Sequence, residues 1–399
     1  MLESNRRCIM KFAWRHNLIY PTILLLWILL RRGDTFILSK VYNFSKNVIF
    51  TLLMFFAEFI TGLLLYFYQK SFLHKKKAKK GAILIYKENK MNKHDPYIKI
   101  VFIILVAGYS DFVEFILSTN YIPKFTKSSS SLDMRAGGIS TISSALFFHY
   151  LLKFPISKHQ VFSLLIIAFC FIIIILLEYY FQDINIFLTY EDFTLKIVLI
   201  ILEQFFHSLL DSCEKYVVEY NSINMFLVLC LEGFFGFWIT FGLLFTEDAH
   251  KIQLKKIYNE KSGGLFALFI FLLFIYVVLC GLKNAYRVVT NKIFSPMTKS
   301  LTDYFLNPLF LIQNYLEGDF VTRGKQNVFY FLINFILSLI INLFGCVFNE
   351  IIILFFCDLE RDTYNQVSFS KSQKNKIIIS LKTHPNKLII EDKIKFIKK

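Results

Sequence analysis

Long apolar segments constrain the fold of this chain more than any other feature of its sequence. Segments such as 158–181 and 264–287 are predominantly apolar over the roughly 18 or more residues that an α-helix needs to cross a bilayer. The whole chain of 399 residues is 55% hydrophobic, with a mean hydropathy of +0.51. A soluble protein of this length would instead alternate apolar and polar faces. The sequence therefore argues against a soluble enzyme and predicts an all-α integral membrane protein.

The apolar segments divide the chain into one membrane domain with short extensions. We expect ten transmembrane helices, at 17–32, 48–68, 99–121, 126–151, 158–181, 193–219, 223–245, 264–287, 293–316 and 326–357. The membrane domain then covers 17–357, in halves of about 17–181 and 193–357, after a cytosolic N-terminus at 1–16. A basic cytosolic loop at 69–98 and a basic cytosolic tail at 358–399 complete the expected organisation.

Lysine and arginine in the loops predict the orientation of these helices. The loop at 69–98 and the tail after Arg361 are the most basic segments of the chain, and such segments stay in the cytosol. Eight expected helices separate the two. Because eight is an even number, one orientation satisfies both segments and places both termini in the cytosol. The net charge of +16 fits a basic tail close to anionic lipid, and we expect no nucleic-acid partner.

Cysteine and histidine do not form the clusters that bind metals. The seven cysteines are dispersed, without a Cys-x-x-Cys motif or a Cys/His cluster, so we expect neither a disulfide framework nor a zinc site. His207 and Asp211 lie four residues apart and could ligate a metal together, but two ligands without a third favour a plain polar seam. We therefore expect no metal and no cofactor.

Ionisable residues inside the expected helices form stripes. Such a residue at the centre of a membrane helix costs roughly 2.5–3.5 kcal/mol, so it faces the interior of the bundle or a watery cavity, unless it lies near a helix end and snorkels to the interface. In the third expected helix, Asp111, Glu114 and Ser118 share one helix face. A second stripe, in the sixth, consists of Glu203, His207, Asp211 and Lys215. Each stripe predicts a polar seam.

The later helices carry further polar residues. The eighth expected helix holds Asn284, together with Lys283 and Arg287 about one turn apart. In the ninth, Lys299 and Asp303 are spaced by four residues, so they could pair along the helix.

The segment "SSSSLDMRAGGIS" at 128–140 places charges near the start of the fourth expected helix. Asp133 and Arg135 are two residues apart and point to different sides of a helix, so they are not partners. Because the third helix ends only a few residues earlier, we expect the two helices to be antiparallel neighbours, with Arg135 close to Asp111 or Glu114. The small residues of this segment, Ser131 among them, would let the helices approach closely.

Two similar sequence segments indicate that the chain consists of duplicated halves. "TKSSSSLD" at 126–133 resembles "TKSLTD" at 298–303, and each lies near the start of the fourth helix of a five-helix half. An odd number of helices per half would invert one copy relative to the other. This is the architecture of many transporters, whose solute site lies between the halves. We therefore expect two inverted five-helix repeats.

Several segments resemble a known transporter family. They begin with "GYSDFVEF" at 108–115, "EKYVVEYN" at 214–221 and "SPMTKSLTDYF" at 295–305. In order and spacing they are similar to the drug/metabolite transporter superfamily, on its nucleotide-sugar-transporter-like side, and most similar to the solute carrier 35 family, F group. The positions that match the family's motifs are Asp111, Ser130, Ser131, Arg135, Ser157, Gln160, Glu214, Lys215, Glu232, Gly233, Gly236, Thr298 and Asp303.

The resemblance implies ten helices in inverted halves, a central cavity and alternating access. We expect transport of a small anionic organic solute, nucleotide-sugar-like or another metabolite. The expected location is an endomembrane, such as that of the Golgi, endoplasmic reticulum, lysosome or vacuole. Membrane lipid is the expected surrounding partner, and a homodimer is one possible state. The candidate residues for solute binding or gating are Asp111, Glu114, Ser131, Arg135, Asp211, Asn284, Lys299 and Asp303.

The sequence leaves one alternative function open, a transporter-derived membrane subunit that scaffolds a larger complex without transporting. Family members place an arginine shortly after the aspartate of the ninth helix, whereas the run here is "DYFLNPLF" at 303–310. An intramembrane enzyme is disfavoured, because the chain has neither a His-x-x-x-His pair nor a Gly-x-Ser-x-Gly motif. We expect no enzymatic activity.

Overall fold

The computed structural model describes most of the expected membrane domain. The described residues are 10–12, 19–42, 44, 48–77, 96–122, 137–152, 156–181, 190–221, 223–245, 254–255, 257–258, 263–293, 299–302, 305–317, 321–322, 325–354 and 359. Of the expected organisation, most of the N-terminus, most of the basic loop at 69–98 and nearly all of the tail at 358–399 lie outside them.

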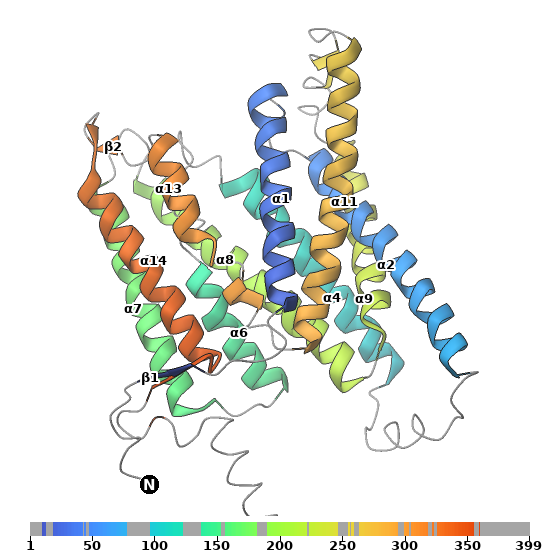
Figure 1. Cartoon of the computed structure of the whole chain (residues 1–399), viewed down its shortest axis with the longest axis horizontal. Helices are drawn as coiled ribbons and strands as arrows, with labels where there is room; N and C mark the ends of the chain where they lie inside the picture. The colour runs from blue at the N-terminus through green and yellow to red at the C-terminus, as the bar shows by residue number, and fades with distance from the viewer. Residues whose placement is uncertain are drawn as a thin grey trace, which may run out of the picture.

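The described part of the chain is almost entirely α-helical (Figure 1). Its α-helices are α1 (Ile19–Tyr42), α2 (Val48–Lys77), α4 (Tyr97–Ile116), α6 (Gly137–Leu152), α7 (Lys158–Phe181), α8 (Tyr190–Lys215), α9 (Met225–Leu243), α11 (Gly263–Ile293), α13 (Asn307–Glu317) and α14 (Val328–Phe348). Each helix expected from the sequence overlaps one of these. Two π-helical segments, η2 (Leu117–Tyr121) and η4 (Tyr216–Tyr220), continue α4 and α8.

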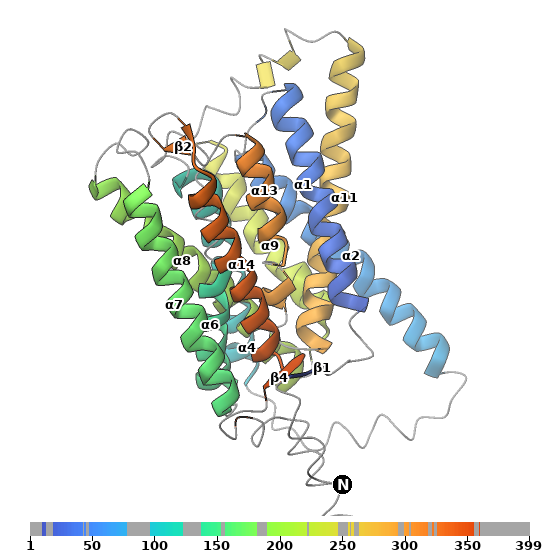
Figure 2. The same ribbon diagram turned by 60° about the vertical axis from the view of Figure 1, so that its left-hand side comes forward.

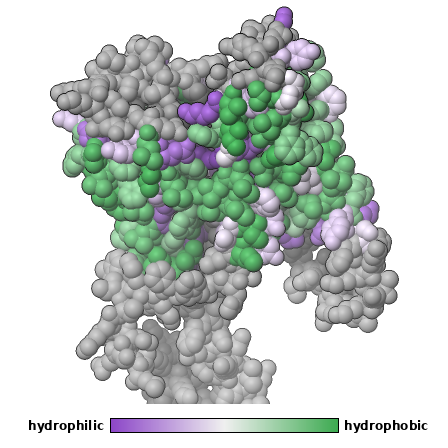
Figure 3. Space-filling view, turned by 45° about the horizontal axis from the view of Figure 1, so that its top comes forward, coloured by the Kyte–Doolittle hydropathy of each residue, from purple (hydrophilic) through white to green (hydrophobic). Residues whose placement is uncertain are grey.

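The protein is a multi-pass membrane protein. Six of the described helices are long and apolar enough to cross a bilayer: Val48–Ser71, Lys158–Phe181, Glu191–Val218, Met225–Leu243, Gly263–Ile293 and Val328–Phe348. Large apolar side chains such as Leu165, Phe169 and Phe329 are exposed on the outside of the bundle, and Figure 3 shows a broad hydrophobic zone across the described surface. Lipid rather than water is the solvent that suits this surface.

The helices pack in two groups that α4 and α8 join (Figures 1 and 2). In one group α2 packs against α9 and α11, and α1 packs against α11. In the other, α7 packs against α14 and α6, and α13 packs against α14. The core of the second group contains Ile167 and Ile174 of α7 and Ile341 of α14. The contact between α4 and α8, together with that between α6 and α8, connects the groups.

Small residues let α2 and α9 approach closely. A Cβ atom at Gly62 would lie 2.6 Å from the backbone nitrogen of Cys230, and a Cβ at Gly233 would overlap the backbone nitrogen of Phe59. Glycine at these two positions therefore brings the backbones into contact, as small residues do in membrane helix pairs. This contact also carries Glu58 and Glu232 into the interior.

The ninth and tenth helices differ from the sequence-based expectation. The ninth was expected at 293–316, but α11 continues to Ile293 and α13 begins only at Asn307; in between, residues 299–302 are helical, residues 305–306 form a turn, and 294–298 and 303–304 lie outside the described residues. Pro308, which follows Asn307, has no backbone N–H and clashes with a preceding helical turn, so it begins a helix rather than continuing one. Residues 299 and 307 are consequently not on one continuous helix.

The tenth helix was expected to extend to residue 357, but α14 ends at Phe348. Glu350 has a φ of 55°, in the left-handed region where helices commonly end. The chain then forms strand β4 (Ile352–Leu354), which pairs antiparallel with β1 (Met10–Phe12). A second short pair, β2 (Val321–Thr322) and β3 (Lys325–Gln326), precedes α14. The segment before α1 and the segment after α14 are thus hydrogen-bonded to each other as a pair of strands.

Candidate functional site

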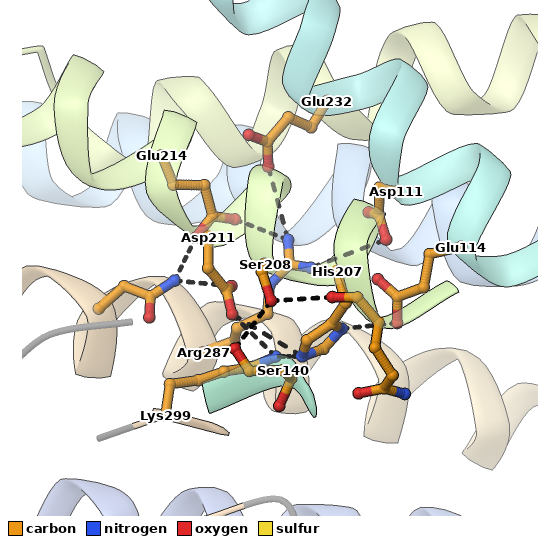
Figure 4. Close-up of polar contacts among 12 residues, drawn as sticks. Asp111, Glu114, Ser140, His207, Ser208, Asp211, Glu214, Glu232, Arg287 and Lys299 are labelled. Carbon is orange, nitrogen blue, oxygen red and sulfur yellow. Dashed lines mark hydrogen bonds and ion pairs between the residues drawn. The ribbon is translucent and has the colours of Figure 1, made fainter. Parts of the chain in front are cut away.

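Four carboxylates from four helices surround one guanidinium group in the interior of the bundle. Figure 4 shows three of them, Asp111, Glu214 and Glu232, around the guanidinium. Arg287 on α11 is the guanidinium, and its Nη2 atom lies 2.8 Å from Glu214 Oε1 of α8. The same nitrogen lies 3.5 Å from Glu232 Oε2 of α9 and 3.9 Å from Glu58 Oε1 of α2. Nη1 lies 3.7 Å from Asp111 Oδ1 of α4. Arg287 therefore connects five helices.

Two asparagines of α11 extend this arrangement along the helix. Asn284 and Asn291 lie one turn before and one turn after Arg287, on the same face of the helix. The side-chain amide of Asn284 donates to Glu58 Oε1, and that of Asn291 donates to Asp211 Oδ1 at 2.9 Å and to Glu214 Oε2 at 2.6 Å. We call Glu58, Asp111, Glu214, Glu232, Asn284, Arg287 and Asn291 the Arg287 cluster.

The side chains of the Arg287 cluster are withdrawn from solvent. Glu58 and Glu232 are fully buried, and Arg287 is 2% exposed. Charges in such a position are costly unless they are paired and hydrogen-bonded, which explains why so many polar groups converge on one point. The described residues line a shallow open hollow elsewhere, at the start of α8 around Glu191 and Leu195.

A second set of charged groups lies next to the Arg287 cluster. Lys299, in the short segment 299–302, is 3.1 Å from Asp211 Oδ2 and also contacts His207 Nε2. His207 Nδ1 lies 2.7 Å from Glu114 Oε1, so the imidazole connects α8 with α4. We call Glu114, His207, Asp211 and Lys299 the Lys299 group. Asn291, which donates to both Asp211 and Glu214, joins the Lys299 group to the Arg287 cluster.

A neighbouring contact brings α6 against the same region. Ser208 of α8 donates to the backbone carbonyl of Ser140 on α6 at 2.9 Å. Gly138, one of the small residues expected to permit close packing, lies beside Ile167, where a Cβ would come within 2.8 Å of a side-chain methyl carbon. The site is therefore bounded by helices of both expected halves.

The structure brings together five of the eight candidate residues: Asp111, Glu114, Asp211, Asn284 and Lys299. The other three, Ser131, Arg135 and Asp303, lie outside the described residues, and so do the expected contacts of Arg135 and of Asp303. The partner that the structure gives Asp111 is Arg287, and Lys299 is bound across helices to Asp211 and His207.

Sequence analysis missed the centre of the site. Arg287 was named only as a charged neighbour of Asn284 in the eighth expected helix, Glu214 and Glu232 only as positions that match a family motif, and Glu58 and Asn291 not at all. A signal for Glu58 was present, because it is the single ionisable residue in the apolar segment 48–68. A lone charge at membrane depth marks a functional position by default.

No metal-binding group of three or more His, Cys, Asp or Glu side chains occurs among the described residues. The arrangement around Arg287 is a network of paired charges and hydrogen bonds.

Comparison with known proteins does not identify a family. No family model matches the sequence, and no curated protein matches it. A solved structure described only as "Crystal structure of protein" matches at 11% sequence identity and a TM-score of 0.44, over 82% of this chain and 93% of that chain.

Proposed function

We propose that the protein is a carrier that moves a small charged organic solute by alternating access, with the Arg287 cluster as its central site. This proposal rests on the observation that both expected halves of the chain supply residues to the cluster. Glu58 and Asp111 come from the first expected half, and Glu214, Glu232 and Arg287 come from the second. A buried charged site shared by two halves is where carriers with inverted repeats bind their solute.

The packing of the helices supports two inverted repeats and ten crossings. If α1, α2, α4, α6 and α7 are exchanged for α8, α9, α11, α13 and α14, then the pair α1–α11 becomes α8–α4. In the same exchange α2–α11 becomes α9–α4, and α6–α7 becomes α13–α14. All six pairs are in contact, and α2–α9 and α7–α14, which map onto themselves, are in contact too. This is the pattern that a two-fold relation between five-helix halves produces.

Under this proposal α1, α4, α6 and α13 supply the crossings beyond the six apolar helices named above. Residues 305–306, which precede α13, form a turn, and under this proposal the turn makes the ninth crossing discontinuous. Discontinuous helices are common at carrier sites because their ends leave polar groups unpaired within the membrane. Lys299, in the helical residues 299–302 before this turn, contacts Asp211 and His207.

The strand pair supports an even number of crossings. β1 precedes the first helix and β4 follows the last, and the two are hydrogen-bonded. Both must therefore lie on the same side of the membrane. With the basic tail in the cytosol, both termini are cytosolic. The resemblance to the solute carrier 35 family, F group, supports the same topology, and we keep its endomembrane location as part of the proposal.

The anionic solute expected from the sequence fits this site poorly. An anion would be attracted by Arg287, but four carboxylates already surround that guanidinium, and each would repel the solute. Because the cluster is buried, we expect a solute to reach it only when the halves move. The π-helical segments η2 and η4, at the ends of two helices that carry charged residues, are of the kind that occurs frequently at functional sites.

The test is solute binding followed by transport. The purified protein is screened by thermal shift against nucleotide sugars, nucleotides, organic acids and amines, because a ligand of the folded state raises its apparent stability. Stabilising compounds are then offered in labelled form to proteoliposomes. We expect uptake by the wild type and by Glu178→Gln, whose buried carboxyl lies away from the cluster beside Tyr330, and none by Arg287→Met. If no stabilising compound is taken up by the wild type, the carrier proposal is wrong.

A second candidate function is a scaffold subunit that does not transport. The observation in its favour is that the side chains of the Arg287 cluster are buried and bind each other. If the protein is a scaffold, we expect a partner to copurify with it in a fixed stoichiometry. We also expect none of the screened compounds to bind to it. A protein that purifies alone and transports would exclude it.

A further inference from the structure

The atoms of the Arg287 cluster that lack a partner are mostly hydrogen-bond acceptors. Glu58 Oε2, Asp111 Oδ2 and Glu232 Oε1 are buried carboxylate oxygens without a hydrogen-bond partner among the described residues. The amide oxygens of Asn284 and Asn291 also lack a hydrogen-bond partner among the described residues, whereas the NH₂ group of each amide donates to a carboxylate. Within the cluster, the corresponding donor is a single atom, Arg287 Nε.

Around these acceptors, the negatively charged groups outnumber the positively charged ones. The carboxylates that face the site are Glu58, Asp111, Glu114, Asp211, Glu214 and Glu232. Among the described residues, the basic groups that interact with these carboxylates are Lys283, Arg287 and Lys299, and His207 is a further titratable side chain beside them. Buried carboxylates that exceed their bases in number need a further source of positive charge.

From these two observations we propose that the Arg287 cluster binds a protonated amine in exchange for protons held on Glu58 and Glu232. An ammonium group supplies what the site lacks, because it carries positive charge and its N–H groups are all donors. This inference deepens the carrier function proposed above and rests on it, since it names the class of solute that the same site takes.

The exchange with protons follows from the same oxygens. Without the amine, a proton on Glu58 or Glu232 removes the negative charge and supplies an O–H donor, so the buried carboxyl is satisfied in a second way. With the amine bound, that proton is released, and the net charge of the site is unchanged for each proton that a singly charged amine replaces. The site then holds the amine or the protons, but not both, which is the condition for antiport.

The experiment measures binding and proton release on the full-length purified protein. Ethylamine, putrescine and tyramine serve as amine probes, and UMP and UDP-glucose serve as anionic probes, all in a thermal-shift assay between about pH 6 and pH 8. We expect at least one amine and neither anion to stabilise the protein. The apparent Kd of that amine should rise about tenfold for each unit by which the pH falls if one proton is exchanged. A pH-indicator dye in weak buffer should record about one proton released per amine bound.

Matched variants locate the exchange. In Glu232→Gln the amine should bind at least tenfold more weakly, with a reduced pH dependence. Glu178→Gln, a buried carboxyl between α7 and α14, should behave as the wild type does. His207→Gln should keep the pH dependence, because the proposal assigns the exchanged proton to carboxylates and not to the imidazole. If Glu232→Gln does not fold, Glu58→Gln and the dye measurement on the wild type test whether protons on these carboxylates are exchanged for the amine.

Three results would overturn the inference. These are the absence of stabilisation by all three amines, stabilisation by UMP or UDP-glucose alone, and amine binding without proton release. Stabilisation by an anion that proteoliposomes then take up would leave the carrier function intact and reject only the amine. Amine binding with proton release, but without uptake into proteoliposomes, would keep the site and reject the carrier.

Discussion

Replacement of Arg287 by methionine tests whether the cluster is held together by charge. The guanidinium is 2% exposed, and its closest carboxylate, Glu214, lies at 2.8 Å. Removal of one partner of a buried ion pair costs about 3–5 kcal/mol, because the other charge stays buried without compensation. Glu58, Asp111 and Glu232 lie farther from the guanidinium, at 3.5–3.9 Å, so we assign the main loss to Glu214. We therefore expect Arg287→Met to lower the free energy of unfolding by about 3–5 kcal/mol.

The assay is equilibrium unfolding by SDS in mixed micelles, with helix content as the signal. Arg287→Lys keeps the charge but loses the two-pronged geometry of the guanidinium, and it should lie between the wild type and Arg287→Met. In the double variant Arg287→Met/Glu214→Gln the nearest uncompensated carboxylate is gone, so part of the stability should return. We expect a coupling energy near the upper end of the range of about 0.5–3 kcal/mol found for contacting residues.

Two outcomes would refute this reasoning. An Arg287→Met protein that loses less than about 1 kcal/mol would resemble the loss of a solvent-exposed pair, which contradicts a buried network. Strict additivity of the Arg287 and Glu214 substitutions would show that these two side chains do not depend on each other.

Three further predictions concern the packing around the site. Gly233→Ala should lower the free energy of unfolding by about 1–3 kcal/mol through overpacking, because the new Cβ would overlap Phe59 and approach Glu58; Gly242→Ala, where the same helix faces open space, should have little effect in the same SDS assay. Lys299→Met should destabilise by about 3–5 kcal/mol, and Lys299→Met/Asp211→Asn should recover part of that loss in a double-mutant cycle, because Lys299 is buried 3.1 Å from Asp211. Glu178→Ala should cost about 1–3 kcal/mol by leaving the hydroxyl of Tyr330 without its acceptor, yet should leave uptake into proteoliposomes unchanged.

The sequence was sufficient for features that depend on local composition. Apolar segments such as 158–181 and 223–245 predicted helices that the structure has at Lys158–Phe181 and Met225–Leu243, because an apolar run of that length can satisfy its backbone in a bilayer only as a helix. The same reasoning placed Asp111 and Glu114 on one face, since the period of a helix fixes which residues share a side. The multi-pass membrane character was confirmed on these grounds.

Local rules also explain where the expected boundaries were wrong. The ninth helix was extended across Pro308, and the tenth was extended past Glu350, where the backbone turns into the left-handed region. Hydropathy does not detect either event, because an apolar segment remains apolar whether it is a helix or a strand. The strand β4 forms only because β1 supplies hydrogen-bond partners from the other end of the chain.

The partners of the charged residues were decided by tertiary structure alone. Asn284 donates to Glu58 across 226 residues of sequence, and Arg287 meets carboxylates from four other helices. Helical periodicity gives the direction of a side chain relative to its own helix, but it carries no information about which helix lies opposite. That choice depends on how closely backbones such as those at Gly62 and Cys230 can approach. The sequence determined that charges lie within the membrane, whereas the packing of the helices decided that they surround one arginine.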